Sequence, residues 1–257
     1  MADEVPLRPA RRGIVLTTSL SFLAGIVDVV GFIALFGLFT SHFTGNFVVI
    51  GQELIHHSWK LVIQVIAIPV FILVVAGTRL VVIHCDRKGY SAFLVCLLMQ
   101  AAFLAGCMLL GVASSPITDP TAVGPIITAQ LGVAAMAVQN AINRLIIPSY
   151  PPTTVMTTNL SQFSIDLVDR FRSHAVHRAA ARARFNRMGP VIAGFALGVI
   201  FGAYTHLAFS FWCLLLPLAG LLVIALFVAE GAFAPALEPH HPAVSGKSRS
   251  RQPRLRR

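Results

Sequence analysis

The chain alternates between long apolar blocks and short polar stretches, and the length of the blocks is its first informative feature. Six blocks reach the roughly 20 residues that an α-helix needs to cross the hydrocarbon core of a bilayer. They cover residues 14–38, 61–83, 91–112, 121–147, 188–206 and 207–230. The last two adjoin one another, so the pattern predicts a tight turn within residues 204–209.

Two further segments, residues 43–55 and 153–168, are shorter and more polar, and the topology depends on them. If both cross the bilayer, the chain has eight spans and the basic residues around 79–88 lie on the outer side. If neither crosses, six spans leave both termini inside, and 19 of the 20 Lys and Arg residues lie on the cytoplasmic side, with Lys60 the exception. The positive-inside rule therefore favours six spans and two short interrupted or re-entrant helices.

The order of these segments repeats along the chain. Residues 14–115 and 116–230 each contain a long span, a short polar segment and two further long spans. Because three is an odd number, the two halves must cross the membrane in opposite directions, as in transporters built from inverted repeats. We expect an all-α, polytopic membrane helix bundle of two inverted three-helix halves, with a cytoplasmic segment over residues 1–13 and a disordered basic tail over residues 231–257.

Composition agrees with a membrane location and explains the net charge. Apolar residues make up 56% of the 257, charged residues only 12%, and the mean hydropathy of +0.78 lies far from the usual mix of soluble domains. The net charge of +10 comes mainly from residues 170–187 and 247–257, which hold 12 of the 20 basic residues, and this flanking distribution argues against a nucleic-acid partner. The first of these runs is expected to be helical and to contact anionic lipid head groups through Arg170, Arg172, Arg178, Arg182, Arg184 and Arg187.

Asp28 is the one carboxylate well inside a long span, because Glu53 and Glu230 lie near segment ends. An ionised side chain at that depth is costly unless it is paired, hydrated or protonated. Two interpretations follow, a proton or cation site and a residue whose hydrogen bonds only pack two helices. In either case we expect Asp28 to face the interior, near residues 44–46 and the amides of Gln139 or Asn140.

Each short segment carries a similar polar motif near its start, Thr44-Gly45-Asn46 in the first half and Thr157-Thr158-Asn159 in the second. Thr and Asn can accept hydrogen bonds from the free N–H groups of a helix start, and Gly permits an unusual turn. If both helices enter the bilayer from opposite faces, their positive ends would meet near its centre and favour an anionic group. The alternative is that both motifs only cap helices lying against the bundle.

Several amides occupy adjacent turns of the fourth span, where Gln139 and Asn143 share a face. Amides inside lipid need partners, so they either bind a substrate or form hydrogen bonds between helices. Gly194 and Gly198, four residues apart, are expected to serve close helix packing. The candidate substrate-binding residues are Asp28, Thr44, Gly45, Asn46, Gln139, Asn140, Thr158 and Asn159.

No motif predicts an enzyme, and we expect no cofactor and no metal. The sequence has no Gly-rich phosphate loop, no ordered Ser-His-Asp set and no paired catalytic carboxylates. Among the nine histidines, His42 is notable because it adjoins the first triplet, whereas His56-His57 and the His174 and His177 pair lack the side chains that would complete a coordination shell.

The residues around the two short segments resemble those of the YoaK-type family, bacterial multi-span membrane proteins labelled as a domain of unknown function. In the first half the matching residues are Ala24 to Asp28, Ser41 to Asn46, and Gly51. In the second half they are Ala135 to Ala141 and Thr153 to Asn159, which match less closely. The resemblance implies a polytopic protein of a bacterial cell (inner) membrane, without implying a substrate.

The apparent inverted halves, the two polar segments and Asp28 together predict a small-solute permease or secondary transporter whose solute is unknown. The alternative is a membrane protein that does not transport, such as a sensor or an assembly factor. The solute, the driving ion and the oligomeric state are not encoded in any recognisable motif.

The six-span arrangement with both termini cytoplasmic predicts a pattern of cysteine accessibility. In a background without native cysteines, residues replaced by cysteine at Lys88 and Ser173 should be protected from an impermeant thiol reagent in intact cells, and one at Asp119 should react, because the charge rule assigns them to opposite sides. Ready labelling at position 88 from outside would contradict the six-span arrangement.

Overall fold

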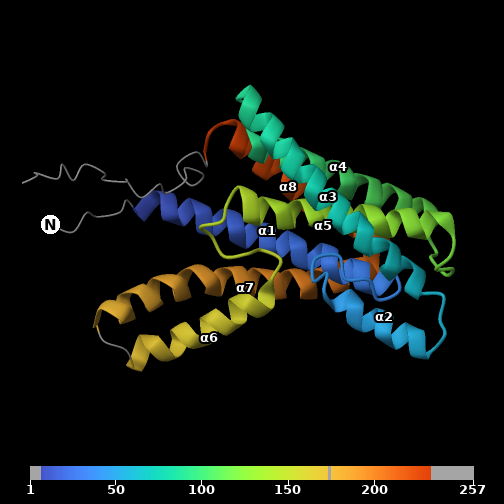
Figure 1. Ribbon diagram of the computed structural model, residues 1–257, viewed down its shortest axis with the longest axis horizontal. Helices are drawn as coiled ribbons and strands as arrows, with labels where there is room; N and C mark the ends of the chain where they lie inside the picture. Colours follow the sequence, from blue (N-terminus) through green and yellow to red (C-terminus); the bar gives the residue numbers. More distant parts are fainter. Residues whose placement is uncertain (1–6, 173–174, 233–257) are drawn as a thin grey trace, which may run out of the picture.

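The protein is a bundle of α-helices, seen in a computed structural model that describes residues 7–172 and 175–232 (Figure 1). Within these ranges there is no β-strand. The helices of the first half are α1 (Leu7–Ala34), α2 (Gly45–Ile55), α3 (Leu61–Lys88) and α4 (Ala92–Ser114). Those of the second half are α5 (Val123–Leu145), α6 (Met156–Arg172), α7 (Ala175–Phe209), the 3-10 helix η1 (Ser210–Leu214) and α8 (Leu215–Ala229).

Five helical stretches of the described chain are long and apolar enough to cross a membrane. Four correspond to α1, α3, α4 and α5, and the fifth, of 53 residues, takes in α7, η1 and α8 together. A straight helix of that length would measure about 80 Å, more than twice the hydrocarbon thickness of a bilayer. The protein is therefore an all-helical, multi-pass membrane protein. The path of the fifth stretch decides how many times the chain crosses the membrane.

The fifth stretch reverses direction at η1. Along α7 and α1 the contact positions rise together, since Gly194 lies against the Thr18 carbonyl and Gly202 against Ile26, so these helices are parallel. Along α8 and α1 they run in opposite senses, since Gly220 lies against Leu23 while Arg12 Nη1 donates to the Ala232 carbonyl oxygen at 2.9 Å. Counting η1 and α8, of 5 and 15 residues, as one continuous helical stretch, six helices of the described chain run along the bundle. Their course can be followed in Figure 1.

Contacts between the remaining long helices give their relative directions in the same way. Gln100 contacts Gln139 and Ser114 contacts Gly124, so α4 and α5 are antiparallel, and α3, joined to α4 by a short turn at Gly89, runs parallel to α5. Gln139 of α5 donates to the carbonyl oxygen of Leu20, in the middle of α1, at 2.9 Å, while Gly13, nearer the start of α1, lies against Tyr150 beyond the end of α5. The first helices of the two halves, α1 and α5, therefore run in opposite directions.

Helices α1 and α7 make the most extensive helix contact in the bundle, and glycines make it possible. A Cβ atom at Gly194 would lie 2.9 Å from the Thr18 carbonyl oxygen, and one at Gly198 would collide with the Phe22 carbonyl oxygen. Since Ser21 Oγ also donates to the Val191 carbonyl oxygen at 2.8 Å, the two backbones meet directly. The packing role expected for Gly194 and Gly198 matches this contact.

The short helices α2 and α6 lie on one side of the bundle and extend in opposite directions from its middle (Figure 1). With 11 and 17 residues they measure about 16 and 26 Å, less than a bilayer core of about 30 Å. Asp166 of α6 is fully buried and accepts hydrogen bonds from Arg184 of α7, the shortest at 2.6 Å. This charged contact fastens α6 to α7.

Several boundaries differ from those expected. The fifth long helix begins at Ala175, because the Arg-rich run, helical as predicted, continues into the apolar block instead of ending before residue 188. The turn before the last helix lies at Ser210, whose φ is 50°, beyond the expected residues 204–209. The first helix begins at Leu7 and not at residue 14, and the expected basic tail lies outside the described residues apart from residues 231 and 232.

The α1–α7 contact predicts that a side chain added at Gly198 destabilises the protein more than one added at Gly77. Gly198→Val should lower the free energy of unfolding by about 2 kcal/mol or more, because the added side chain meets backbone that has no room to move. Gly77→Val is the matched control, since nothing lies within 4 Å of its Cβ position. Thermal unfolding of both purified variants measures the difference, and equal melting temperatures would contradict the close packing.

Candidate functional site

The first polar site forms because the chain turns back on itself after α1. Phe36 and Gly37 both adopt left-handed backbone conformations, with φ of 57° and 80°. Gln64 of α3 holds this turn by donating to the Phe36 carbonyl oxygen at 2.9 Å. The segment that follows runs back beside α1, so Thr40, Ser41 and His42 lie next to Asp28 instead of beyond the end of the helix.

Asp28 is buried, with 5% of its surface exposed, and both carboxylate oxygens have partners. Its Oδ1 accepts from the backbone N–H of Thr40 at 2.9 Å and of Ser41 at 2.7 Å, and also from the Thr40 hydroxyl at 3.2 Å. Two backbone donors and one hydroxyl replace the water that the carboxylate loses. Asp28 therefore binds the returning segment to the interior face of α1.

The second carboxylate oxygen pairs with a histidine. Nδ1 of His42 lies 2.7 Å from Asp28 Oδ2, and the His42 side chain keeps 28% of its surface exposed. The ring also packs edge-on against Phe195 of α7, with ring centroids 4.9 Å apart. His42 therefore joins Asp28 to α7 and is the more accessible member of the pair, a geometry in which a proton can be held between a carboxylate and an imidazole.

A buried asparagine fixes the start of each short helix in the same way. Asn46 accepts from the Phe39 N–H at 2.9 Å and donates to the Phe39 carbonyl oxygen at 2.7 Å. Asn159, at the start of α6, donates to the Pro152 carbonyl oxygen at 2.6 Å, again seven residues earlier in the chain. Each asparagine thus binds the extended segment that leads into its own helix.

The second half has an amide network where the first half has a carboxylate. Gln139 and Asn143 both donate to the Thr153 hydroxyl, at 2.8 and 2.9 Å, and the Thr154 hydroxyl donates to Asn140 Oδ1 at 2.9 Å. Gln139 also accepts from Gln100 of α4 at 2.7 Å. The segment before α6 is therefore bound to α5 by neutral groups alone.

Two amide oxygens in this region accept no hydrogen bond from the described part of the chain. Oδ1 of Asn143 and Oδ1 of Asn159 are buried, and neither has a hydrogen-bond partner within the described part of the chain. A buried acceptor without a donor costs about 1–3 kcal/mol, so each favours a donor supplied by water or by a bound molecule. The second network therefore contains two hydrogen-bond acceptors that are not used within the described chain.

Five of the eight predicted site residues belong to two hydrogen-bonded networks, and Thr44, Gly45 and Thr158 belong to neither. Asp28 and Asn46 belong to the first network, and Gln139, Asn140 and Asn159 to the second. The expected proximity of Gln139 to Asp28 is wrong, because Gln139 contacts Leu20, about 12 Å lower along α1. The two networks are separate sites.

The threonines of both triplets do not take part. Thr44 and Thr158 are exposed, and the Thr44 side chain makes no capping hydrogen bond, so the expected helix-capping role of Thr44 is wrong. Asn46 reaches back to the loop instead of capping α2, and Gly45 is required because a Cβ there would lie 2.8 Å from the Phe39 ring. The residues that sequence reasoning missed are the hydroxyl partners, Thr40 and Ser41 in one half and Thr153 and Thr154 in the other.

A resident metal centre has no evident ligand set in the described chain, since no three His, Cys, Asp or Glu side chains gather at one point. The ionisable pair of the first site consists of one carboxylate and one imidazole. Such a pair can bind and release a proton, and the surrounding hydroxyl and backbone groups can hold the carboxylate in place while it does so.

Comparison with known proteins yields one match. A family model described as a protein of unknown function (DUF1275) matches residues 16–227, a range that contains both polar networks and, in whole or in part, the eight α-helices of the described chain. No curated protein and no solved structure matches the chain. The description of the family names neither a function nor a substrate.

The asparagine contacts predict a clear difference within the first triplet. Asn46→Ala should lower the free energy of unfolding by about 2 kcal/mol, because it leaves the partly buried N–H and carbonyl groups of Phe39 without their side-chain partner. Thr44→Ala, two residues away, should change stability by less than about 0.5 kcal/mol because Thr44 is exposed and caps nothing. Denaturant titration in detergent compares the two, and a larger effect at Thr44 would contradict the assignment.

Proposed function

We propose that this chain, which belongs to the DUF1275 family of proteins of unknown function, is a proton-coupled permease for a small solute. Asp28 and His42 are the proton-binding pair in this proposal. The observation that carries it is a carboxylate buried inside a long apolar helix and joined at 2.7 Å to a partly exposed imidazole. Ionisable pairs at such depth are costly to keep and are typical of proton pathways.

Helix direction supports a transporter. Helices α1 and α5 open the two halves and run antiparallel, and each is followed by a short helix and two long ones. We infer that the halves form an inverted repeat, the arrangement in which transporters bind solute near the middle of the membrane and alternate between two faces. The short helices α2 and α6, whose N-terminal ends face the middle of the bundle in Figure 1, fit the discontinuous helices of such sites.

The proton-binding pair contacts two other parts of the chain, the segment before α2 and the helix α7. Asp28 holds the segment before α2 through Thr40 and Ser41, while the His42 ring contacts Phe195 of α7. Protonation of Asp28 would weaken the charge-assisted bonds that hold this segment, because a neutral carboxyl is a poorer acceptor. Gain and loss of one proton would thus alter how the returning segment is held between α1 and α7.

The second network is proposed to bind the solute. Its partners are neutral, and it offers the unpaired oxygens of Asn143 and Asn159 as acceptors. A solute with N–H or O–H donors would complete these hydrogen bonds. The first half would then bind the proton that drives transport, and the second half would bind the solute.

We further propose that the protein lies in a bacterial inner membrane with both termini cytoplasmic, as a YoaK-type member. In that orientation the Arg-rich start of α7 lies at the inner surface, where exposed Arg182 and Arg187 would contact anionic head groups. Arg184 contributes less than expected because it is engaged by Asp166.

The test separates proton coupling from folding. A thermal-shift screen of a metabolite library with the purified wild type first identifies a stabilising solute. In proteoliposomes containing a trapped pH dye, that solute should then drive proton entry through the wild type. Asp28→Asn should keep the folded state and solute binding but lose about 90% or more of the proton flux, because the amide keeps hydrogen bonding without titrating. His42→Gln should reduce the flux strongly as well.

His206→Gln is the matched control, because His206 lies on α7 and contacts Phe211, away from Asp28. It should transport protons at the rate of the wild type. Undiminished flux in Asp28→Asn, or equal losses in all three variants, would contradict the proposal.

A further inference from the structure

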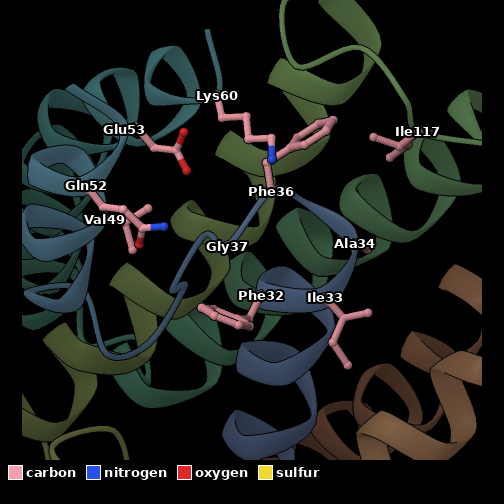
Figure 2. A pocket seen from close by; sticks show the side chains of 10 residues that line it. All are labelled: Phe32, Ile33, Ala34, Phe36, Gly37, Val49, Gln52, Glu53, Lys60 and Ile117. Carbon is pink, nitrogen blue, oxygen red and sulfur yellow. The ribbon is translucent and has the colours of Figure 1, made fainter. Parts of the chain in front are cut away.

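A pocket separate from both polar networks lies at the end of the bundle where α1 ends and α3 begins. Its volume is about 380 Å³, within the range of small-molecule sites. Three parts of the chain enclose it: the last turn of α1 with the Phe36–Gly37 turn, the second half of α2, and the residue before α3. Figure 2 shows these walls, with Ile117 of the α4–α5 loop on the far side.

The pocket contains a carboxylate without a partner. Glu53 is 9% exposed, and within the described chain its side chain makes no hydrogen bond and no ion pair. In Figure 2 this carboxylate is directed into the space between α2 and the Phe36–Gly37 turn. Glu53 is mostly shielded from water and has no partner in the described chain, so its carboxylate favours a cation that enters the pocket.

Two further charged features line the pocket, one partly negative and one positive. The C-terminal turn of α1, at Ile33 and Ala34, lines the same pocket, and helix C-termini carry a partial negative charge. Lys60 lines another wall, more than 4 Å from any carboxylate of the described chain. It is also the single basic residue that the charge pattern assigns to the opposite side from all others.

The remaining walls are apolar. Phe32, Phe36 and Ile117 offer rings and a branched aliphatic side chain, while Gln52 adds one amide. Gln64 fixes the Phe36 wall through its hydrogen bond to the Phe36 carbonyl oxygen, so this side of the pocket is formed without a ligand. The pocket thus combines a negative group, a positive group and an apolar surface.

We propose that this pocket binds a small zwitterion with an apolar body, of the class of hydrophobic α-amino acids, with its ammonium group on Glu53 and its carboxylate on Lys60. The proposal concerns binding alone and does not depend on proton coupling or transport. Asp28 and His42 take no part, because neither lines the pocket.

The probe is L-leucine, compared with isopentylamine and 4-methylpentanoate, which carry only the ammonium or only the carboxylate. Isothermal titration calorimetry on the full-length protein in detergent measures each. Leucine should bind the wild type about tenfold or more tightly than either single-charge analogue, because only leucine engages both charges.

Substitutions assign each charge. Glu53→Gln should weaken leucine and isopentylamine by about tenfold or more, and Lys60→Met should weaken leucine and 4-methylpentanoate. Glu230→Gln and Lys88→Met, at exposed positions outside the pocket, are matched controls and should bind leucine like the wild type. Because Glu53 is unpaired, its neutralisation should not lower the melting temperature, which separates lost binding from lost folding.

Three outcomes would overturn the assignment. They are no heat of binding for leucine, methionine or phenylalanine with the wild type, leucine affinity unchanged in Glu53→Gln, and isopentylamine binding as tightly as leucine. The last would identify a site for amines in which Lys60 has no role. Because calorimetry needs no gradient, failure here leaves the proton-flux experiment unaffected, and failure of proton flux leaves this result unaffected.

Discussion

The arrangement of the first half depends on one electrostatic requirement, that the carboxylate of Asp28 be hydrogen-bonded at a depth where water is scarce. The helix containing Asp28 cannot supply the donors, because its own N–H groups are used within the helix. The chain supplies them by turning at Phe36 and Gly37 and returning with Thr40 and Ser41. The position of α2 and of His42 follows from that return.

A second constraint holds the bundle around this site. Glycines on α7 bring its backbone against α1, so that Phe195 reaches the His42 ring from the neighbouring helix. In the second half the corresponding segment is held to α5 by amides and hydroxyls, without charge. In both halves hydrogen bonds hold the segment before the short helix, but the first half uses a carboxylate and the second half uses neutral groups.

Sequence reasoning reached the helices and the depth of Asp28, because apolar length and the cost of a buried charge are local properties. It missed Thr40 and Ser41, since their contact with Asp28 requires a chain reversal that apolar patterning does not encode. A threonine before a helix predicts a cap, but the Thr44 side chain makes no capping hydrogen bond, and Asn46 binds the preceding loop instead. Apolar patterning places the start of α7 too late, because the polar first turns of this helix are stabilised by contact with α6.

That polar start makes α7 about 52 Å long, roughly 20 Å more than a bilayer core is thick. The helix continues through Pro190, and α6 is attached to its protruding end by Asp166 and Arg184. Phe195, the residue that touches His42, lies on the same helix. The charged contact with α6 and the contact with the partly exposed His42 ring are therefore joined through a single helix, which links the protruding end of the protein to the Asp28–His42 pair.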